Sequence, residues 1–319
     1  MSMNKVNIIL CTYNGEKYIE KQLDSILNQT YQNIDIYIHD DGSKDCTLEK
    51  VKLVKERNRT NKKIIILNET NNLGYPECFI KTLLDADKSD YYAFSDQDDI
   101  WNPDKIERAV KCLDDCKDIH KKPVLYYSAV DYYDEELNFK RHSRFATTLK
   151  KKTNDLGLLE FLFGGEPLGM TYVFNNKVRD ALEKTHELNF REFKDGFIKI
   201  YCAAAGKVVY DRKSSAKYVR HPTATTAASN PDSMIKRYFA MFDEMFLKKD
   251  TYEYFRNIVE VLLLYFSDEI SEENKKLLQL FTRPNYIYKR MKKVFYNGRF
   301  RNVFTDEIAY RLLFLTGRV

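Results

Sequence analysis

Four apolar runs in the first third of the sequence are each followed by a short polar turn, at residues 6–11, 34–38, 64–67 and 91–94. Between the runs, apolar residues recur every three or four positions, which is the spacing of one face of a helix. Strands that alternate with helices are typical of parallel β-α units, and the loops after such strands gather at one edge of the sheet. The pattern therefore predicts an α/β fold with a doubly wound, mostly parallel sheet and a ligand site at that edge.

The alternation weakens after Pro123. Strands are expected at residues 124–129, 170–174 and 208–210, and helices at residues 178–184 and 197–205. A small, polar stretch at residues 223–231 predicts a loop or linker, and the chain beyond Asp232 has a helical and aromatic pattern. We therefore expect a catalytic domain over residues 1–222 and a helical C-terminal region over residues 223–319.

Three carboxylates follow the fourth apolar run within four positions: Asp96, Asp98 and Asp99. Carboxylates this close repel one another unless a positive group compensates them. Mg²⁺ and Mn²⁺ prefer oxygen ligands and commonly bridge carboxylates to a substrate's phosphates. The cluster therefore predicts a metal–diphosphate site. The alternative is a solvated acidic turn that caps the helix beginning near Pro103.

Composition and the pattern of apolar residues indicate the cellular compartment in which the protein is expected. The chain has 319 residues, and no apolar run approaches the ~20 residues of a transmembrane helix. The first residues lead directly into a strand pattern, so we expect no signal peptide. Six cysteines lie scattered without a metal-binding spacing, which favours reduced thiols in a cytoplasmic protein.

The stretch from residue 283 to residue 301 is basic, with seven Lys or Arg and no Asp or Glu. Cations mixed with aromatic residues suit a helix that lies on an anionic membrane, peripheral to its inner face, where a lipid-linked acceptor would be found. A solvated helix face and an oligomer contact are the alternatives. A nucleic-acid partner is not expected, because the acidic N-terminal loops oppose it.

Four ordered motifs then identify a family. They are Cys-Thr-Tyr-Asn at residues 11–14, Asp-Asp-Gly-Ser at 40–43, Asn-Asn-Leu-Gly at 71–74 and Ser-Asp-Gln-Asp-Asp-Ile-Trp at 95–101. The chain resembles the family 2 glycosyltransferases of the GT-A fold over residues 4–222, and most of all their bacterial rhamnosyltransferase-like branch. Residues 169–175 resemble that branch's acceptor-side strand.

The resemblance implies an inverting, metal-dependent enzyme that uses Mn²⁺ or Mg²⁺. Its donor would be a UDP- or dTDP-linked rhamnose or hexose. The acceptor would be a hydroxyl of a growing glycan or lipid-linked glycan, in capsule or another bacterial polysaccharide.

The first motif is expected to hold the nucleotide. By resemblance, Thr12, Tyr13, Asn14 and Glu16 place backbone N–H groups and the Tyr13 ring around the base. The alternative is an ordinary turn between strand and helix. Gly74, in the third motif, belongs to the same predicted set.

Asp41, and less directly Asp40, would accept a hydrogen bond from N3–H of a pyrimidine. A carboxylate acceptor selects uracil or thymine, since N3 of unprotonated cytosine carries no hydrogen. The alternative is that both residues cap the following helix.

The resemblance makes Asp98 the more direct metal ligand, while Asp96 touches the ribose or the metal and Asp99 orients loop groups or binds the sugar. Trp101 is expected to pack beneath this loop. His221, beside Arg220, either binds metal or phosphate or is a structural histidine beside a turn proline.

Inversion by one direct displacement requires a general base that deprotonates the acceptor hydroxyl. Asp195 occupies the place of the family base, with Glu192 as the second candidate. Lys194 before it and Gly196 after it depart from the family pattern. The alternative is that Asp195 serves as a helix N-cap.

Two other functions remain open at this stage. A sugar-nucleotidyltransferase is also an α/β protein with carboxylates and Mg²⁺, but residues 10–17 lack the Gly-rich, basic phosphate loop that it usually needs. An inactive scaffold subunit with a transferase fold is opposed by the intact carboxylate set, although the altered surroundings of Asp195 keep it possible.

Overall fold

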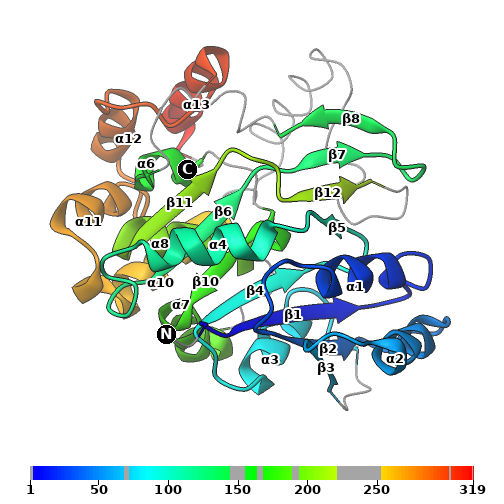
Figure 1. Ribbon diagram of the computed structural model, residues 1–319. Helices are drawn as coiled ribbons and strands as arrows, with labels where there is room; N and C mark the ends of the chain where they lie inside the picture. The colour runs from blue at the N-terminus through cyan, green and yellow to red at the C-terminus, as the bar shows by residue number, and fades with distance from the viewer. Residues whose placement is uncertain are drawn as a thin grey trace.

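The computed structural model describes residues 3–67, 72–143, 155–163, 168–188, 194–220, 253–301, 303–317 and 319. A central sheet has the strand order β3-β2-β1-β4-β10-β6-β11-β9 (Figure 1). Its strands are β1 (Val6–Thr12), β2 (Ile34–Asp40), β3 (Lys63–Ile66), β4 (Tyr91–Ser95), β6 (Val124–Ser128), β9 (Asp155–Leu156), β10 (Val173–Asn175) and β11 (Lys207–Asp211). β1, β2, β3 and β4 are parallel to one another, whereas β10 runs antiparallel to both β4 and β6.

Helices cover both faces of this sheet, as they do in doubly wound folds. They are α1 (Ile19–Leu27), α2 (Thr47–Arg57), α3 (Glu77–Asp85), α4 (Lys105–Asp114), α7 (Asn176–Thr185) and α8 (Lys194–Ala205). Alternate residues of a strand point to opposite faces. Accordingly, Ile8 and Leu10 of β1 pack in the core beneath α1 and α4, whereas Ile9 packs in the core beneath α3, α7 and α8. The predicted α/β architecture is confirmed.

The carboxyl ends of three strands meet at one edge of the sheet. In the register of the parallel pairs, Thr12 lies opposite Asp40, and Leu10 lies opposite Ser95. The turns that follow these strands therefore start side by side. This edge carries the first, second and fourth motifs, as the alternating pattern predicts.

A second, smaller sheet lies beyond the end of β4 and was not predicted. It has the order β5-β12-β7-β8, with β5 (Ile100–Trp101), β7 (Asp131–Tyr133), β8 (Phe139–His142) and β12 (Ala216–Val219). Strands of two to four residues are too short to show an alternating pattern. Because β5 pairs with β12, the acidic loop between β4 and β5 is fixed at both ends.

The strand predicted at residues 170–174 is shorter and begins later. Residues Gly169–Thr171 form a 3-10 turn, and β10 occupies Val173–Asn175. The Thr171 hydroxyl and N–H both donate to the Leu168 carbonyl, at 2.8 and 2.9 Å. Side-chain bonds of this kind offer the backbone an alternative to a strand ladder.

Helices α10 (Glu253–Tyr265), α11 (Glu272–Gln279), α12 (Ile287–Val294) and α13 (Phe304–Thr316) follow. α10 packs against α8, and Phe255, Phe281 and Phe314 join the same buried cluster as α8. None of the described helices is long and apolar enough to cross a lipid bilayer. The linker expected at residues 223–231 lies outside the described residues, and the division at residue 222 stays a prediction.

Candidate active site

Gln97, the middle residue of the Asp-x-Asp motif, holds the turn after β1. Gln97 accepts a hydrogen bond from the Tyr13 N–H at 2.9 Å and donates to the Tyr13 carbonyl at 3.0 Å. A Cβ added to Gly15 would lie 2.1 Å from Gln97 Oε1, so glycine is required for this approach. The Tyr13 ring remains 46% exposed. The first and fourth motifs therefore form one rigid surface with an aromatic ring at its rim.

The predicted nucleotide residues on this turn also hold the loop after β2. The Thr12 hydroxyl donates to Asp40 Oδ1 at 2.8 Å. Asn14 Oδ1 accepts from the Lys44 N–H at 2.9 Å, and Glu16 Oε2 accepts from the Cys46 N–H at 3.0 Å. These side chains cross-link the first two loops, so their order does not depend on a ligand.

Asp40 and Asp41 are both buried, and each holds a different loop. Asp40 accepts from the Ser43 hydroxyl at 2.6 Å and from the Ser43 N–H at 3.0 Å. Asp41 accepts from the Leu73 N–H at 2.5 Å and from the Gly74 N–H at 2.9 Å. Asp41 thereby attaches the end of the third motif to the end of β2.

Neither residue caps α2, because the N-cap position of that helix is Cys46. The capping alternative is therefore wrong for both. A carboxylate has about four acceptor positions, so the two N–H bonds and the contact of His39 Nε2 with Oδ1 at 3.3 Å leave Asp41 able to accept one more.

The acidic motif combines two half-buried carboxylates with one that is fully buried. Asp96 and Asp98 are partly accessible, whereas Asp99 is 1% exposed. Burial raises the pKa of the Asp99 carboxyl well above its ordinary value, and the negative charges of Asp98 and Asp96 raise it further. A solvated capping turn does not describe this motif, since Asp99 is buried and the N-cap position of α4 is Asp104.

Among the described residues, this donor set fits a divalent cation only together with ligands that these residues do not supply. Within the described segments, no three His, Cys, Asp and Glu side chains converge into a ready-made metal site. Mg²⁺ and similar ions are usually held by one or two carboxylates together with substrate phosphates and water. Asp96 and Asp98 match that arrangement, because they are accessible and their charges repel.

A buried cation lies beneath the acidic motif and was missed from the sequence. Lys105, at the start of α4, is fully buried, and its ammonium donates to the Met170 carbonyl and lies 3.7 Å from the centre of the Trp101 ring. Burial lowers its pKa to about 7, while the charges of Asp99 and Asp96 oppose that change. Trp101 is 3% exposed and packs under the loop, as expected. The lysine thus partly compensates the acidic motif from below.

Asp195 lies in the first turn of α8 and contacts the turn before β10. Its Oδ2 accepts from the Gly169 N–H at 3.1 Å, and its carbonyl accepts from the Tyr172 hydroxyl at 3.3 Å. A Cβ added to Gly169 would lie 2.2 Å from Asp195 Oδ1. Only glycine at position 169 therefore allows the carboxylate to occupy its observed place.

Tyr75 connects Asp195 with the acidic motif. Burial of its hydroxyl raises the pKa of Tyr75, and the negative charges of Asp195 and then Asp96 raise it further, although the residue as a whole is 55% exposed. A single hydroxyl therefore lies close enough to both carboxylates to be affected by each. The predicted base and the predicted metal-binding motif belong to one site.

Some predicted residues cannot be placed. His221, the second base candidate Glu192 and Asn71 of the third motif lie outside the described residues. Arg220 is described, and its backbone N–H donates to the Tyr133 carbonyl at 2.9 Å in the small sheet. Three supporting roles were not predicted: Gln97, within the fourth motif, holds the turn after β1, Lys105 is a buried counter-charge, and Tyr75 lies between Asp195 and Asp96.

A doubly wound sheet whose strand ends hold an aromatic turn, a paired-aspartate loop and an Asp-x-Asp motif defines a GT-A type glycosyltransferase. The model of the family described as "Glycosyl transferase family 2" matches residues 7–215, which is more than half of the chain. The chain belongs to that family.

Two curated relatives carry related descriptions. A "dTDP-rhamnosyl transferase RfbG" of Shigella flexneri is 44% identical over 108 residues, which cover 33% of this chain and 36% of the relative. An "Uncharacterized glycosyltransferase" of Haemophilus influenzae is 39% identical over 112 residues, covering 34% of this chain and 32% of the relative. The matches thus span about a third of these relatives.

The fold is also found in a solved structure. The crystal structure of S. aureus TarS residues 1–349, in complex with UDP-GlcNAc, superimposes with a TM-score of 0.54. That match covers 97% of this chain and 92% of the TarS chain at 19% sequence identity. The GT-A fold expected from the motifs is confirmed.

Proposed function

We propose that the chain is an inverting, metal-dependent transferase that moves rhamnose or a hexose from a UDP- or dTDP-sugar to a hydroxyl of a growing bacterial polysaccharide. The observation that carries the proposal is that Asp195 is hydrogen-bonded to Gly169 in the turn before β10, and that β10 runs antiparallel to β4, so this turn lies at the end of β4 that carries Asp96. A carboxylate base on the acceptor side then faces the diphosphate-binding motif across one site. Residues 1–222 would form the catalytic unit, and the enzyme would act in the cytoplasm.

The donor end of the site would be formed by the first three motifs. The exposed Tyr13 ring would stack on the base, since aromatic rings at a rim stack on nucleobases. Asp41 would accept N3–H of uracil or thymine with its remaining acceptor capacity. The name of the Shigella relative, which matches a third of this chain, supports dTDP-rhamnose as one donor to test.

Asp98 and Asp96 would hold Mn²⁺ or Mg²⁺ together with the donor's phosphates, with His221 as a further ligand. When bound, the cation would stabilise the negative charge that develops on the leaving diphosphate. Asp99 would remain beneath the loop and fix its shape, because it is buried and lies next to Lys105. The protein's own part is to hold these carboxylates at the end of β4.

Asp195 would remove the proton from the acceptor hydroxyl as that oxygen attacks the anomeric carbon. The Gly169 N–H holds one carboxylate oxygen, which orients the group. The Tyr75 hydroxyl lies near both this carboxylate and Asp96, so the base would lie close to the diphosphate-binding end of the site. A base fixed on the side opposite the leaving group gives an inverted product by one displacement.

Thermal shift with a nucleotide panel tests the donor site. UDP, dTDP, GDP and CDP are each added with and without Mn²⁺, because a ligand that binds only the folded chain raises its melting temperature. We expect stabilisation by UDP or dTDP that requires Mn²⁺. Preference for GDP or CDP would contradict the role of Asp41, and Asp41→Asn should remove the preference for uracil and thymine.

Donor turnover separates the transferase from the inactive scaffold. Release of UDP or dTDP is measured with each sugar donor, in the presence and absence of a bacterial glycan acceptor. We expect release that depends on Mn²⁺ and that rises with acceptor. A chain that binds nucleotide but releases none from any donor would favour the scaffold.

A further inference from the structure

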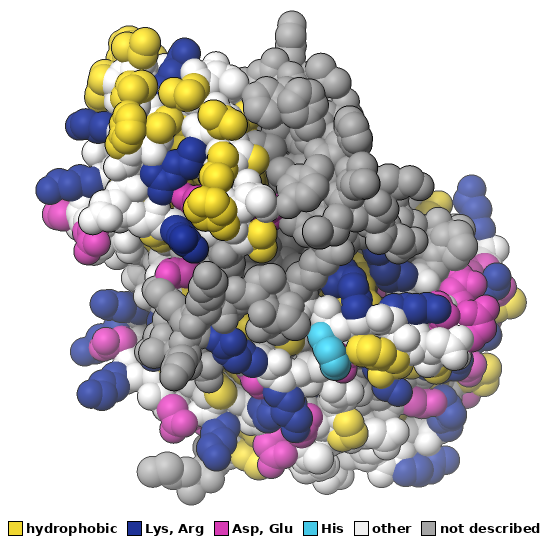
Figure 2. All heavy atoms as spheres, turned by 90° about the horizontal axis from the view of Figure 1, so that it is seen from above, with side chains coloured by type: hydrophobic (Ala, Val, Ile, Leu, Met, Phe, Trp, Pro, Cys, Tyr) yellow, Lys and Arg dark blue, Asp and Glu magenta, His cyan; other side chains and the backbone are white. Residues whose placement is uncertain are grey.

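Large apolar side chains are concentrated on the outer side of the last two helices. On or next to α12, they are Ile287, Met291 and Phe295; on α13, they are Phe304, Ile308, Leu312 and Leu315. All seven are between 42% and 75% exposed. Spacings of three and four residues place them on one side of each helix. Figure 2 shows hydrophobic side chains gathered over the C-terminal helices, with Lys and Arg side chains among them. We call these seven residues the α12–α13 face.

The same helices also bury an apolar side. Leu313 and Phe314 of α13 are fully buried in the aromatic cluster that includes Phe281 and Phe300. A helix that is apolar on two sides needs a second surface to cover the outer one. Scattered single exposures are normal on soluble proteins, whereas a contiguous set marks an interaction site.

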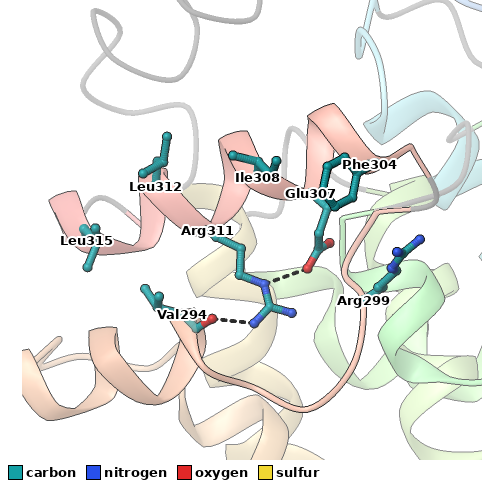
Figure 3. Close-up of a pocket in the computed structure, with 8 residues that line it drawn as sticks. All are labelled: Val294, Arg299, Phe304, Glu307, Ile308, Arg311, Leu312 and Leu315. Carbon is teal, nitrogen blue, oxygen red and sulfur yellow. Dashed lines mark hydrogen bonds and ion pairs between the residues drawn. The ribbon is translucent and has the colours of Figure 1, made fainter.

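The α12–α13 hairpin is firmly held, so the exposed side is a stable feature of the fold. Arg311 donates to Glu307 Oε1 at 2.7 Å and to the Tyr296 carbonyl at 2.9 Å, and it also donates to the carbonyls of Val294 and Gly298. Figure 3 shows the bonds of Arg311 to Glu307 and to the Val294 carbonyl, and the four bonds together fix the loop between the helices. Above them is a hollow of about 340 Å³ whose apolar rim is formed by α13. The hairpin therefore presents its apolar side chains from a rigid base.

The exposed charges of α12, α13 and the loop between them are all positive among the described residues. From residue 283 to residue 319, Asp306 and Glu307 are the only acidic residues in the sequence, and both are buried. Lys292 and Arg299 are exposed beside the face, and Arg299 lies at the rim of the hollow. Among the described residues, these two helices and their loop therefore combine exposed apolar groups with exposed cations. The exposed carboxylate of Glu273 on α11 lines a neighbouring hollow together with Lys292 and Phe295, and the buried Glu307 lines the hollow described above.

We propose that the α12–α13 face binds the surface of an anionic lipid bilayer, with its apolar side chains in the interface and Lys292 and Arg299 at the headgroups. Interfacial helices have this combination of an apolar side and flanking cations. A second copy of the chain fits less well. A two-fold contact places the same patch on both partners, which would bring the cations of one copy against those of the other. If the proposed function is right, this bilayer is where the enzyme would reach its lipid-linked acceptor. Binding to the bilayer does not itself require sugar transfer, so the two proposals can be tested separately.

Vesicle sedimentation tests this proposal with the whole chain. The protein is mixed at low salt with pelletable vesicles of phosphatidylcholine alone or with about a third phosphatidylglycerol. We expect binding to the anionic vesicles only, and weaker binding as salt rises, because salt screens the surface potential. Each basic residue near the surface contributes about fivefold in partitioning, so Lys292→Gln with Arg299→Gln should weaken it about 25-fold.

The apolar contribution is tested with Ile308→Ser combined with Leu312→Ser. Both positions are exposed, so the fold should be retained, and partitioning should fall by about tenfold or more. Leu53→Ser on α2, at a residue that is 56% exposed and far from this hairpin in sequence, is the matched control. Binding to anionic vesicles that the Ser pair leaves unchanged would overturn the assignment. So would absence of binding to any vesicle.

Two further readouts separate this proposal from the others. If light scattering shows a dimer that the Ser pair dissociates, the face joins two copies of the chain and the membrane proposal is wrong. The Ser pair should leave the Mn²⁺-dependent thermal shift by nucleotide unchanged, since the face lies outside the donor site. Vesicle binding without donor turnover would contradict the proposed function but not the proposed membrane binding.

Discussion

Lys105 is the buried residue whose removal should disturb the site most directly. In Lys105→Met, the side chain keeps a similar length and apolar stem but loses its charge. Asp99 would remain buried beside Asp96 and Asp98 without its cation, and the Met170 carbonyl would lose its donor. Leaving the buried Met170 carbonyl without a donor costs about 1–3 kcal/mol, and loss of the positive charge that opposes protonation of Asp99 adds to that cost. Protonation of Asp99 relieves part of that cost, because its pKa is already raised.

We therefore expect Lys105→Met to lower the free energy of unfolding by about 2 kcal/mol, in the middle of that range. For a chain of this size, about 2–4 °C of melting temperature corresponds to each kcal/mol, so a decrease of roughly 4–8 °C is expected. The assay is urea unfolding followed by circular dichroism. Lys111→Met, at an exposed position on the same helix, should change stability by no more than about 0.5 kcal/mol.

The double variant Lys105→Met with Asp99→Asn tests the reasoning itself. Removing both charges leaves no uncompensated buried ion, so the double variant should be more stable than the sum of the two single losses predicts. Strict additivity would show that Lys105 and Asp99 do not interact. A Lys105→Met protein as stable as the wild type would refute the idea that the lysine compensates the acidic motif.

The remaining predictions concern positioning in the site. Gly169→Ala should lower kcat at least tenfold with little change in nucleotide affinity, since a Cβ would displace the Asp195 carboxylate; an unchanged kcat would contradict this. Gln97→Ala removes two hydrogen bonds to Tyr13 and should weaken nucleotide binding by up to about 30-fold, because each such bond contributes about 1 kcal/mol. Isothermal titration in Mn²⁺ measures that change, and a Kd equal to wild type would show that the clamp is dispensable. Tyr13→Ala should weaken the same binding by roughly tenfold or more, whereas Tyr13→Phe should retain it, because stacking contributes about 1–3 kcal/mol per base. Equal losses in the two Tyr13 variants would point to the hydroxyl instead of the ring.

The fold was largely predictable, because parallel β-α units produce a regular alternation of apolar strand segments and amphipathic helices in the sequence. Strands β1, β2 and β4 are mostly apolar, since both faces of the sheet are covered, and the polar turn after each marks the carboxyl edge. The rule that such edges hold ligands was enough to bring residues 12–16, 40–41 and 96–99 together. Strands of two to four residues, such as β5 and β12, are too short to show a recognisable apolar pattern and were missed.

The supporting residues of the site were not predictable in the same way. A lysine counts as a surface residue in any hydrophobic pattern, so the complete burial of Lys105 could not be read from its neighbours. Gln97 clamps a turn 84 positions earlier in the chain, and a pairing over that distance leaves no local pattern. Position 105 does fall on the buried side of α4, with Ile106, Ala109 and Val110. That helical phase was the one available signal.

The central claim is that Asp195 is the base of a glycosyl transfer, and Asp195→Asn tests it most directly. Sugar transfer to acceptor and Mn²⁺-dependent nucleotide binding are measured on the same preparation, with Asp180→Asn, at an exposed position on α7, as the matched control. We expect Asp195→Asn to abolish transfer while nucleotide affinity stays within about twofold of wild type, because a general base contributes about 10²–10⁴-fold to rate. An Asp195→Asn protein with full transfer activity would show that another group takes the proton.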